Sequence, residues 1–248
     1  MSESWPGGED SVINPARRGT TLSMADERAD EVAVRIPVAD GIVLDADLVI
    51  PNGAMGVIVF AHGSGSSRHS VRNRAVAGRL QEAELATLLL DLLTPDEGAM
   101  DVRTGEHRFD VGLLARRLAA AAEWVAARPE LETRPVGYFG ASTGAAGALI
   151  AAADHPERIG AVVSRGGRVD LAGEALSRVR CPTLMIVGAN DPTVLDLNRQ
   201  ARRALAVETA LEVVPGASHL FEEPGALDVV ADLATRWFVA HLGGSPER

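Results

Sequence analysis

The spacing of hydrophobic residues divides the chain into a short alternating part and a longer part of uniformly apolar runs. Between residues 32 and 48, apolar and polar positions alternate on either side of Ala39-Asp40-Gly41, which has turn composition, so we expect an antiparallel hairpin there. Six mostly apolar runs follow, at residues 57–60, 85–90, 135–139, 159–163, 182–187 and 210–214. Strands that are apolar on both faces belong in a parallel sheet covered by helices on each side.

Helical periodicity fills the intervals between these runs. Ala, Leu and Val recur at helical spacing over about 71–83, 110–127, 143–153, 196–205 and 225–241. The alternation predicts an α/β fold, a three-layer α/β/α sandwich around a mostly parallel eight-stranded sheet with an N-terminal antiparallel hairpin. Ligands of such folds bind at the carboxyl ends of the strands, so the chemistry is expected in the loops at that edge.

The regular pattern predicts one domain, over residues 31–242, because the chain shows no internal repeat or interdomain linker. Residues 1–30 are polar and rich in Gly, Ser, Asp and Arg, which predicts a disordered tail. Residues 243–248 form a short C-terminal tail in this interpretation. Met24 opens the better-patterned part of the chain and is a candidate translation start.

Net charge and cysteine content limit the classes of partner and the cellular compartment that we expect. The net charge of −10 argues against nucleic acid or an anionic membrane as a partner, since both require a cationic face. No signal peptide or apolar run of about 18 residues is visible, so no membrane-spanning helix is expected. The single cysteine, Cys181, excludes an intramolecular disulfide and fits a cytoplasmic protein. The sequence leaves the oligomeric state open.

The strongest chemical signal is Gly140-Ala141-Ser142-Thr143-Gly144, where a buried strand ends, five residues match G-x-S-x-G, and a helix of small residues begins. In this motif the serine occupies a sharp strand-to-helix turn with strained backbone angles, and the glycines remove the clash of a β-carbon. The alternative is an ordinary Gly/Ser turn that caps a helix. The context favours Ser142 as a nucleophile.

A serine nucleophile requires a base that is held by an acid. Of the six histidines, His219 alone comes directly after the last predicted strand, and Asp191 ends the strand before it. The order serine, acid, histidine is typical of this arrangement. Asp196 is a rival for the acid. The other interpretations are a helix cap for Asp191, since Pro192 follows it, and a solvated loop position for His219.

The backbone N–H groups of Thr143, at the start of the helix, and of Ser64, in the loop after the run 57–60, are candidate donors to an oxyanion. His62 in the same loop is a candidate substrate contact. The loop could instead cradle a phosphate. It lacks the Walker lysine and the third glycine of the dinucleotide fingerprint, which argues against that interpretation.

Arg165 is expected at the carboxyl end of a strand, where its guanidinium could hold a substrate carboxylate or phosphate. Alternatively, it pairs structurally with Asp170 or Asp91. Between the strand that ends near Ser164 and the one that begins near Pro182 there is no room for a large lid. We therefore expect an open cleft and a small or partly polar acyl substrate.

Taken together, His62-Gly63, the elbow at Ser142, Asp191 and His219 resemble the α/β-hydrolase superfamily, and more closely its dienelactone-hydrolase-like branch, over about residues 31–242. The resemblance implies a serine hydrolase of small carboxylic esters, thioesters or lactones that works through an acyl-enzyme. Authentic dienelactone hydrolases have a cysteine where this chain has Ser142. Similar sequences occur both alone and fused to phosphoribosyltransferase-like domains.

Two other function classes are compatible with these residues. A triad alone also permits a peptidase or an acyltransferase, and the same fold can serve as a non-catalytic ligand receptor. The intact set of Ser142, Asp191 and His219 favours a hydrolase, because a receptor has no need of all three. The expected partner is a small-molecule acyl substrate. No metal or organic cofactor is implied, since hydrolysis requires only water.

Overall fold

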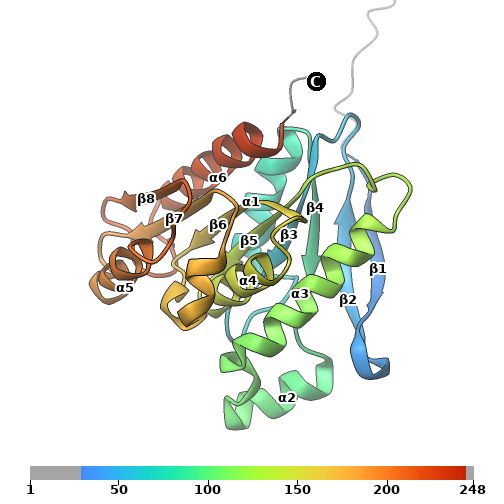
Figure 1. Ribbon diagram of the computed structural model, residues 1–248, viewed down its shortest axis with the longest axis horizontal. Helices are drawn as coiled ribbons and strands as arrows, with labels where there is room; N and C mark the ends of the chain where they lie inside the picture. The colour runs from blue at the N-terminus through green and yellow to red at the C-terminus, as the bar shows by residue number, and fades with distance from the viewer. Residues whose placement is uncertain (1–28, 244–248) are drawn as a thin grey trace, which may run out of the picture.

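The computed structural model describes residues 29–243, which are built around one eight-stranded sheet of order β1-β2-β4-β3-β5-β6-β7-β8 (Figure 1). The strands are β1 (Glu31–Pro37), β2 (Val43–Val49), β3 (Gly56–Ala61), β4 (Leu85–Leu90), β5 (Val136–Ala141), β6 (Ile159–Arg165), β7 (Thr183–Gly188) and β8 (Thr209–Val214). β1 and β2 form the predicted antiparallel hairpin, and β2 is also antiparallel to β4. All other neighbours are parallel, which confirms the predicted sheet.

The helices are α1 (Val71–Glu82), α2 (Pro95–Thr104), α3 (Val111–Ala126), α4 (Thr143–Asp154), α5 (Pro192–Arg202) and α6 (Ala226–Leu242), with short 3-10 turns η1 (Ala39–Gly41), η2 (His107–Phe109) and η3 (Val169–Arg178). In β3, Val57 and Val59 join the core under α3 and α4, whereas Ile58 and Phe60 join the core under α1 and α6. Both faces are therefore covered, as the apolar strands predict, and Figure 1 shows α3 and α4 in front of the sheet.

Helix α2 was not among the predicted helices. Its ten residues contain few apolar side chains, so hydrophobic spacing does not reveal it. The signal lies at its ends: the Thr94 side chain accepts from the Glu97 N–H, and the Glu97 side chain accepts from the Thr94 N–H. Pro95 occupies the first turn, and Gly105 ends the helix at φ 70°. This is a capping box with the usual proline and glycine at the two ends.

The connection from β6 to β7 contains only η3, so it forms no large cap, as predicted. The predicted tails and the candidate start at Met24 fall almost entirely outside the described residues. Within residues 29–243, none of the helices combines the length and the apolar character that crossing a membrane requires.

Candidate active site

Ser142 stands at the junction of β5 and α4 with φ 50° and ψ −123°, a conformation that is strained for any residue with a side chain. The flanking glycines make this turn possible. A β-carbon at Gly140 would lie 2.4 Å from the Ala145 Cα, and one at Gly144 would lie 2.4 Å from the Ala61 carbonyl oxygen. The chain thus has the nucleophile-elbow geometry that the motif predicts.

His219 and Asp191 are in direct contact: His219 Nδ1 lies 2.6 Å from Asp191 Oδ2. Asp191 also caps α5, where its Oδ1 accepts from the Val194 N–H at 3.4 Å. The carboxylate therefore pairs with His219 and caps the helix at the same time. The rival Asp196 points elsewhere and pairs with Arg199 at 3.0 Å on the surface. The structure therefore brings Asp191, and not Asp196, to His219.

Residues 165–166, at the end of β6, contact both the elbow and His219. The Arg165 carbonyl accepts from the Ser142 N–H at 3.3 Å, and the next residue, Gly166, lies against the imidazole. A β-carbon at Gly166 would lie 3.5 Å from His219 Nδ1 and Cε1. Among the described residues no hydrogen bond joins Ser142 Oγ to His219. Catalytic hydrogen bonds are commonly long without substrate and tighten when it binds.

The loop after β3 lies directly against the elbow. A β-carbon at Gly63 would come within 3.0 Å of the Ser142 Cβ, so only glycine allows this approach. The Ser64 and Thr143 hydroxyls are 3.1 Å apart, which ties the loop to the N-terminus of α4. The helix N-terminus concentrates unpaired N–H groups and a partial positive charge beside the serine, as an oxyanion requires.

Both ring nitrogens of His62 make hydrogen bonds to backbone groups nearby. Its ring is buried; Nδ1 lies 2.9 Å from the Gly63 carbonyl, and Nε2 lies 3.0 Å from the Leu92 N–H. Burial lowers the pKa of His62, so the ring is neutral, donates from Nδ1 and accepts at Nε2. Both nitrogens therefore hold the loop to the end of β4, and only the carbon edge of the ring is left for a substrate.

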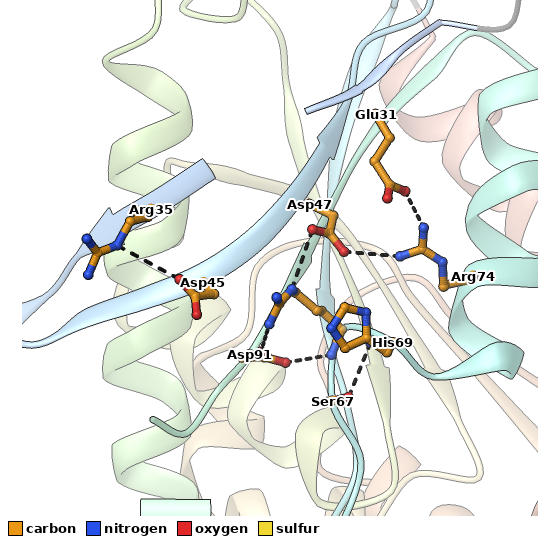
Figure 2. A network of polar contacts seen from close by, with 9 residues as sticks. Glu31, Arg35, Asp45, Asp47, Ser67, His69, Arg74 and Asp91 are labelled. Carbon is orange, nitrogen blue, oxygen red and sulfur yellow. Dashed lines mark hydrogen bonds and ion pairs between the residues drawn. The ribbon is translucent and has the colours of Figure 1, made fainter. Parts of the chain in front are cut away.

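A network of charges lies behind the same loop (Figure 2). The Arg68 N–H donates to Asp91 Oδ1 at 2.7 Å, and the Arg68 guanidinium pairs with Asp91 and with Asp47, the latter at 3.4 Å. Arg74 on α1 also pairs with Asp47, at 3.1 Å, and with Glu31 on β1. Asp91, at the end of β4, therefore holds the loop after β3 in place.

Arg165 differs from the other arginines near the site. It is 8% exposed, and within residues 29–243 its Nε and Nη1 have no hydrogen-bond partner. The expected structural alternatives are wrong: Asp170 pairs with Arg168 at 2.9 Å, and Asp91 pairs with the loop after β3. Burial, together with the neighbouring charge of Arg72, lowers the pKa of Arg165 to about 10. The guanidinium is thus a buried cation at neutral pH, and no acidic side chain in the described part of the chain pairs with it.

Comparison with known proteins places this site in a family context. Residues 44–237 match the dienelactone hydrolase family. A crystal structure of a dienelactone hydrolase from Anabaena variabilis is 54% identical, with a TM-score of 0.85 over 87% of this chain and 99% of that one. A serine hydrolase without a lid from Xanthomonas campestris shares the fold, with a TM-score of 0.69 at 21% identity over 88% of this chain and 97% of that one.

Curated relatives from two strains of Mycobacterium tuberculosis carry a provisional phosphoribosyl transferase name. They are 50% identical over 238 residues, which is 96% of this chain and 50% of each relative. The chain therefore spans about half the length of these proteins. Because the family match extends from β2 into α6 and includes the elbow, Asp191 and His219, the chain belongs to the dienelactone hydrolase family, within the α/β-hydrolase superfamily.

Proposed function

We propose that this chain is a serine hydrolase that cleaves small carboxylic esters, thioesters or lactones through an acyl-enzyme. The observation that carries the proposal is the combination of a strained elbow at Ser142 with the 2.6 Å contact between His219 and Asp191. Strain of this kind persists where the surroundings enforce it, and it exposes the serine hydroxyl at the edge of the sheet.

In the acylation step, Ser142 Oγ attacks the substrate carbonyl carbon and transfers its proton to His219 Nε2. Asp191 accepts from His219 Nδ1, which fixes the tautomer and stabilises the imidazolium. The carbonyl oxygen becomes an oxyanion and accepts hydrogen bonds from the backbone N–H groups of Thr143 and Ser64. The carbon–oxygen or carbon–sulfur bond to the leaving group then breaks, and His219 returns the proton to that group.

Deacylation repeats the same steps with water as the nucleophile. His219 takes a proton from water, the hydroxide attacks the Ser142 ester, and the acid product leaves as the proton returns to Ser142 Oγ. No metal or organic cofactor takes part in this scheme. A single oxyanion donor typically contributes about 10²–10³ in turnover, so the support of the loop after β3 by His62 and Arg68 matters for rate.

We further propose that Arg165 binds an anionic group of the substrate, a carboxylate or a phosphate. A buried guanidinium whose Nε and Nη1 have no partner among the described residues is energetically unfavourable in the free protein, and an anionic substrate group would supply a counter-charge and a hydrogen-bond acceptor. Arg165 directly precedes Gly166, which lies against the His219 imidazole, so we assign the anion to the leaving-group side of the substrate.

Other activities share parts of this chemistry. A peptidase or an acyltransferase uses the same triad, and a receptor would use the cleft without the triad. The phosphoribosyl transferase name belongs to relatives twice as long as this chain, so it describes proteins of which this chain matches only half. Hydrolysis of an activated ester at Ser142 is the activity that the family and the elbow support together.

The test is covalent labelling with a fluorophosphonate, read by intact mass. We expect one adduct on the parent chain and on the control Ser177→Ala, whose hydroxyl lies on the surface of η3. We expect none on Ser142→Ala. A well-folded parent that takes up no label would overturn the hydrolase proposal and favour the receptor.

A further inference from the structure

A cavity of about 320 Å³ lies between the loop after β3, the loop after β4 and helix α2. Ser64 and Thr143, the proposed oxyanion donors, form part of its wall, so the cavity opens directly beside the elbow. Its apolar lining consists of Leu92, Leu93, Pro95, Val102 and Leu114. This volume is at the lower end of the range for small-molecule sites.

The sheet order determines which part of a substrate this cavity faces. Ser142 follows β5, with β3 and β4 on one side and β6, β7 and β8 on the other. His219 follows β8 and, as general acid, stands next to the leaving group. The cavity belongs to the β3–β4 side, and His219 is not part of its wall. A substrate with its carbonyl oxygen at Ser64 and Thr143 therefore directs its acyl group into the cavity.

Both arginines in the cavity wall are paired with aspartates of the same wall. Arg68 pairs with Asp91, and Arg108 donates to Asp101 Oδ2 at 2.8 Å and to its carbonyl at 2.7 Å. The remaining acid, Asp45, is half exposed and lies 3.9 Å from Arg35. Because each guanidinium in the wall already has an anion, the cavity offers no binding energy to a charged acyl group and favours an uncharged, apolar one.

Helix α2, which closes the cavity, is anchored at both ends. Near its start, Glu97 receives two hydrogen bonds from the guanidinium of Arg117 on α3, at 2.6 and 2.7 Å. Burial alone would raise the pKa of Glu97, but the contacts with Arg117 and Thr94 outweigh it and lower the pKa to about 2. Near its end, Asp101 is held by Arg108. The cavity is therefore preformed.

Gly98 on α2 borders the free space of the cavity. Pro95, Gly98 and Val102 all line the cavity, as helical spacing of three and four residues requires for one face. A β-carbon at Gly98 would meet no atom within 4 Å, so a side chain that begins there starts in open space. Glycine inside a helix is unfavourable by about 1 kcal/mol relative to alanine, so Gly98 leaves space in the cavity at a cost in helix stability.

We propose that the cavity under α2 is the acyl pocket, that it takes a compact, uncharged apolar acyl group, and that Gly98 sets the upper size of that group. The assignment rests on the proposed hydrolase activity at Ser142.

The experiment measures kcat/KM for p-nitrophenyl acetate and p-nitrophenyl butyrate, which share one leaving group. The two extra methylenes of butyrate should raise kcat/KM about tenfold in the parent chain. In Gly98→Leu we expect this preference to disappear, with the acetate value within about threefold of the parent. The matched control is Gly78→Leu, a glycine inside α1 that also has no atom within 4 Å of its built β-carbon and lies outside the cavity wall.

Two results would overturn the pocket assignment. One is a butyrate-to-acetate ratio in Gly98→Leu equal to that of Gly78→Leu. The other is an equal loss for both esters in Gly98→Leu, which would indicate general damage to the site. Fluorophosphonate labelling separates the two proposals: a parent that is labelled at Ser142 but shows no acyl preference refutes the pocket alone, whereas an unlabelled, inactive parent refutes both.

Discussion

The arginines on the two sides of Ser142 differ in whether they have an acidic partner. On the β3–β4 side, Arg117 is 3% exposed and makes a bidentate pair with Glu97, and Arg68 pairs with Asp91. On the β6–β8 side, Arg165 is 8% exposed, and its Nε and Nη1 have no partner among the residues that the structure describes. Arg117 and Arg165 are buried to nearly the same extent, so they differ mainly in whether an acidic side chain pairs with them. Paired arginines hold backbone segments in place, whereas an unpaired one keeps its hydrogen-bonding capacity for a ligand.

The largest effect is expected on the β6–β8 side, at the contact between Asp191 and His219. Asp191→Asn should lower kcat by about 10³ to 10⁴, because the amide cannot stabilise the imidazolium and allows the wrong tautomer. The control is Asp196→Asn on the same helix, whose surface pair with Arg199 contributes little. The measurement is ester turnover under saturating substrate. Equal activity of the two variants would remove Asp191 from the mechanism.

The stability of two arginine variants tests the comparison directly. Arg117→Met should lower the free energy of unfolding by about 2–3 kcal/mol, since it leaves Glu97 without its partner. Arg165→Met should raise it by about 1 kcal/mol, because it removes a buried charge that lacks an anion. Urea unfolding of the free protein measures both values. Destabilisation of similar size in both variants would mean that Arg165 is satisfied structurally, and the contrast would fail.

The smallest effect is a change in selectivity at Arg165. We compare 4-acetoxybenzoate with 4-acetoxytoluene, which carry an anionic and a neutral leaving group with the same acetyl group. Arg165→Met should lower kcat/KM for the benzoate by about 10- to 100-fold, the range for a charge-assisted hydrogen bond, and leave the toluene derivative within about threefold. Arg168→Met is the control, since Arg168 already pairs with Asp170. A uniform loss for both esters in Arg165→Met would refute an anion site.

Hydrophobic spacing was sufficient for most of the fold. The run 85–90 coincides with β4, and the other predicted strands agree with the structure to within two residues at each end. Strands buried on both faces are uniformly apolar, so they stand out in the sequence. Helix α2 was missed because it covers a cavity and not the core, and an apolar face is therefore not required of it. Only its capping residues mark it.

The amino-acid sequence by itself determined the sheet, the elbow at Ser142 and the order of the candidate triad, because local geometry requires glycines at fixed spacing and strands require apolar runs. Only the tertiary structure decided which charges meet. With 24 arginines and 34 acids, the sequence permits very many pairs, and contacts such as Arg117 with Glu97 depend on where separate elements pack. The same reason explains why the unpaired state of Arg165 and the open space at Gly98 appear only in three dimensions.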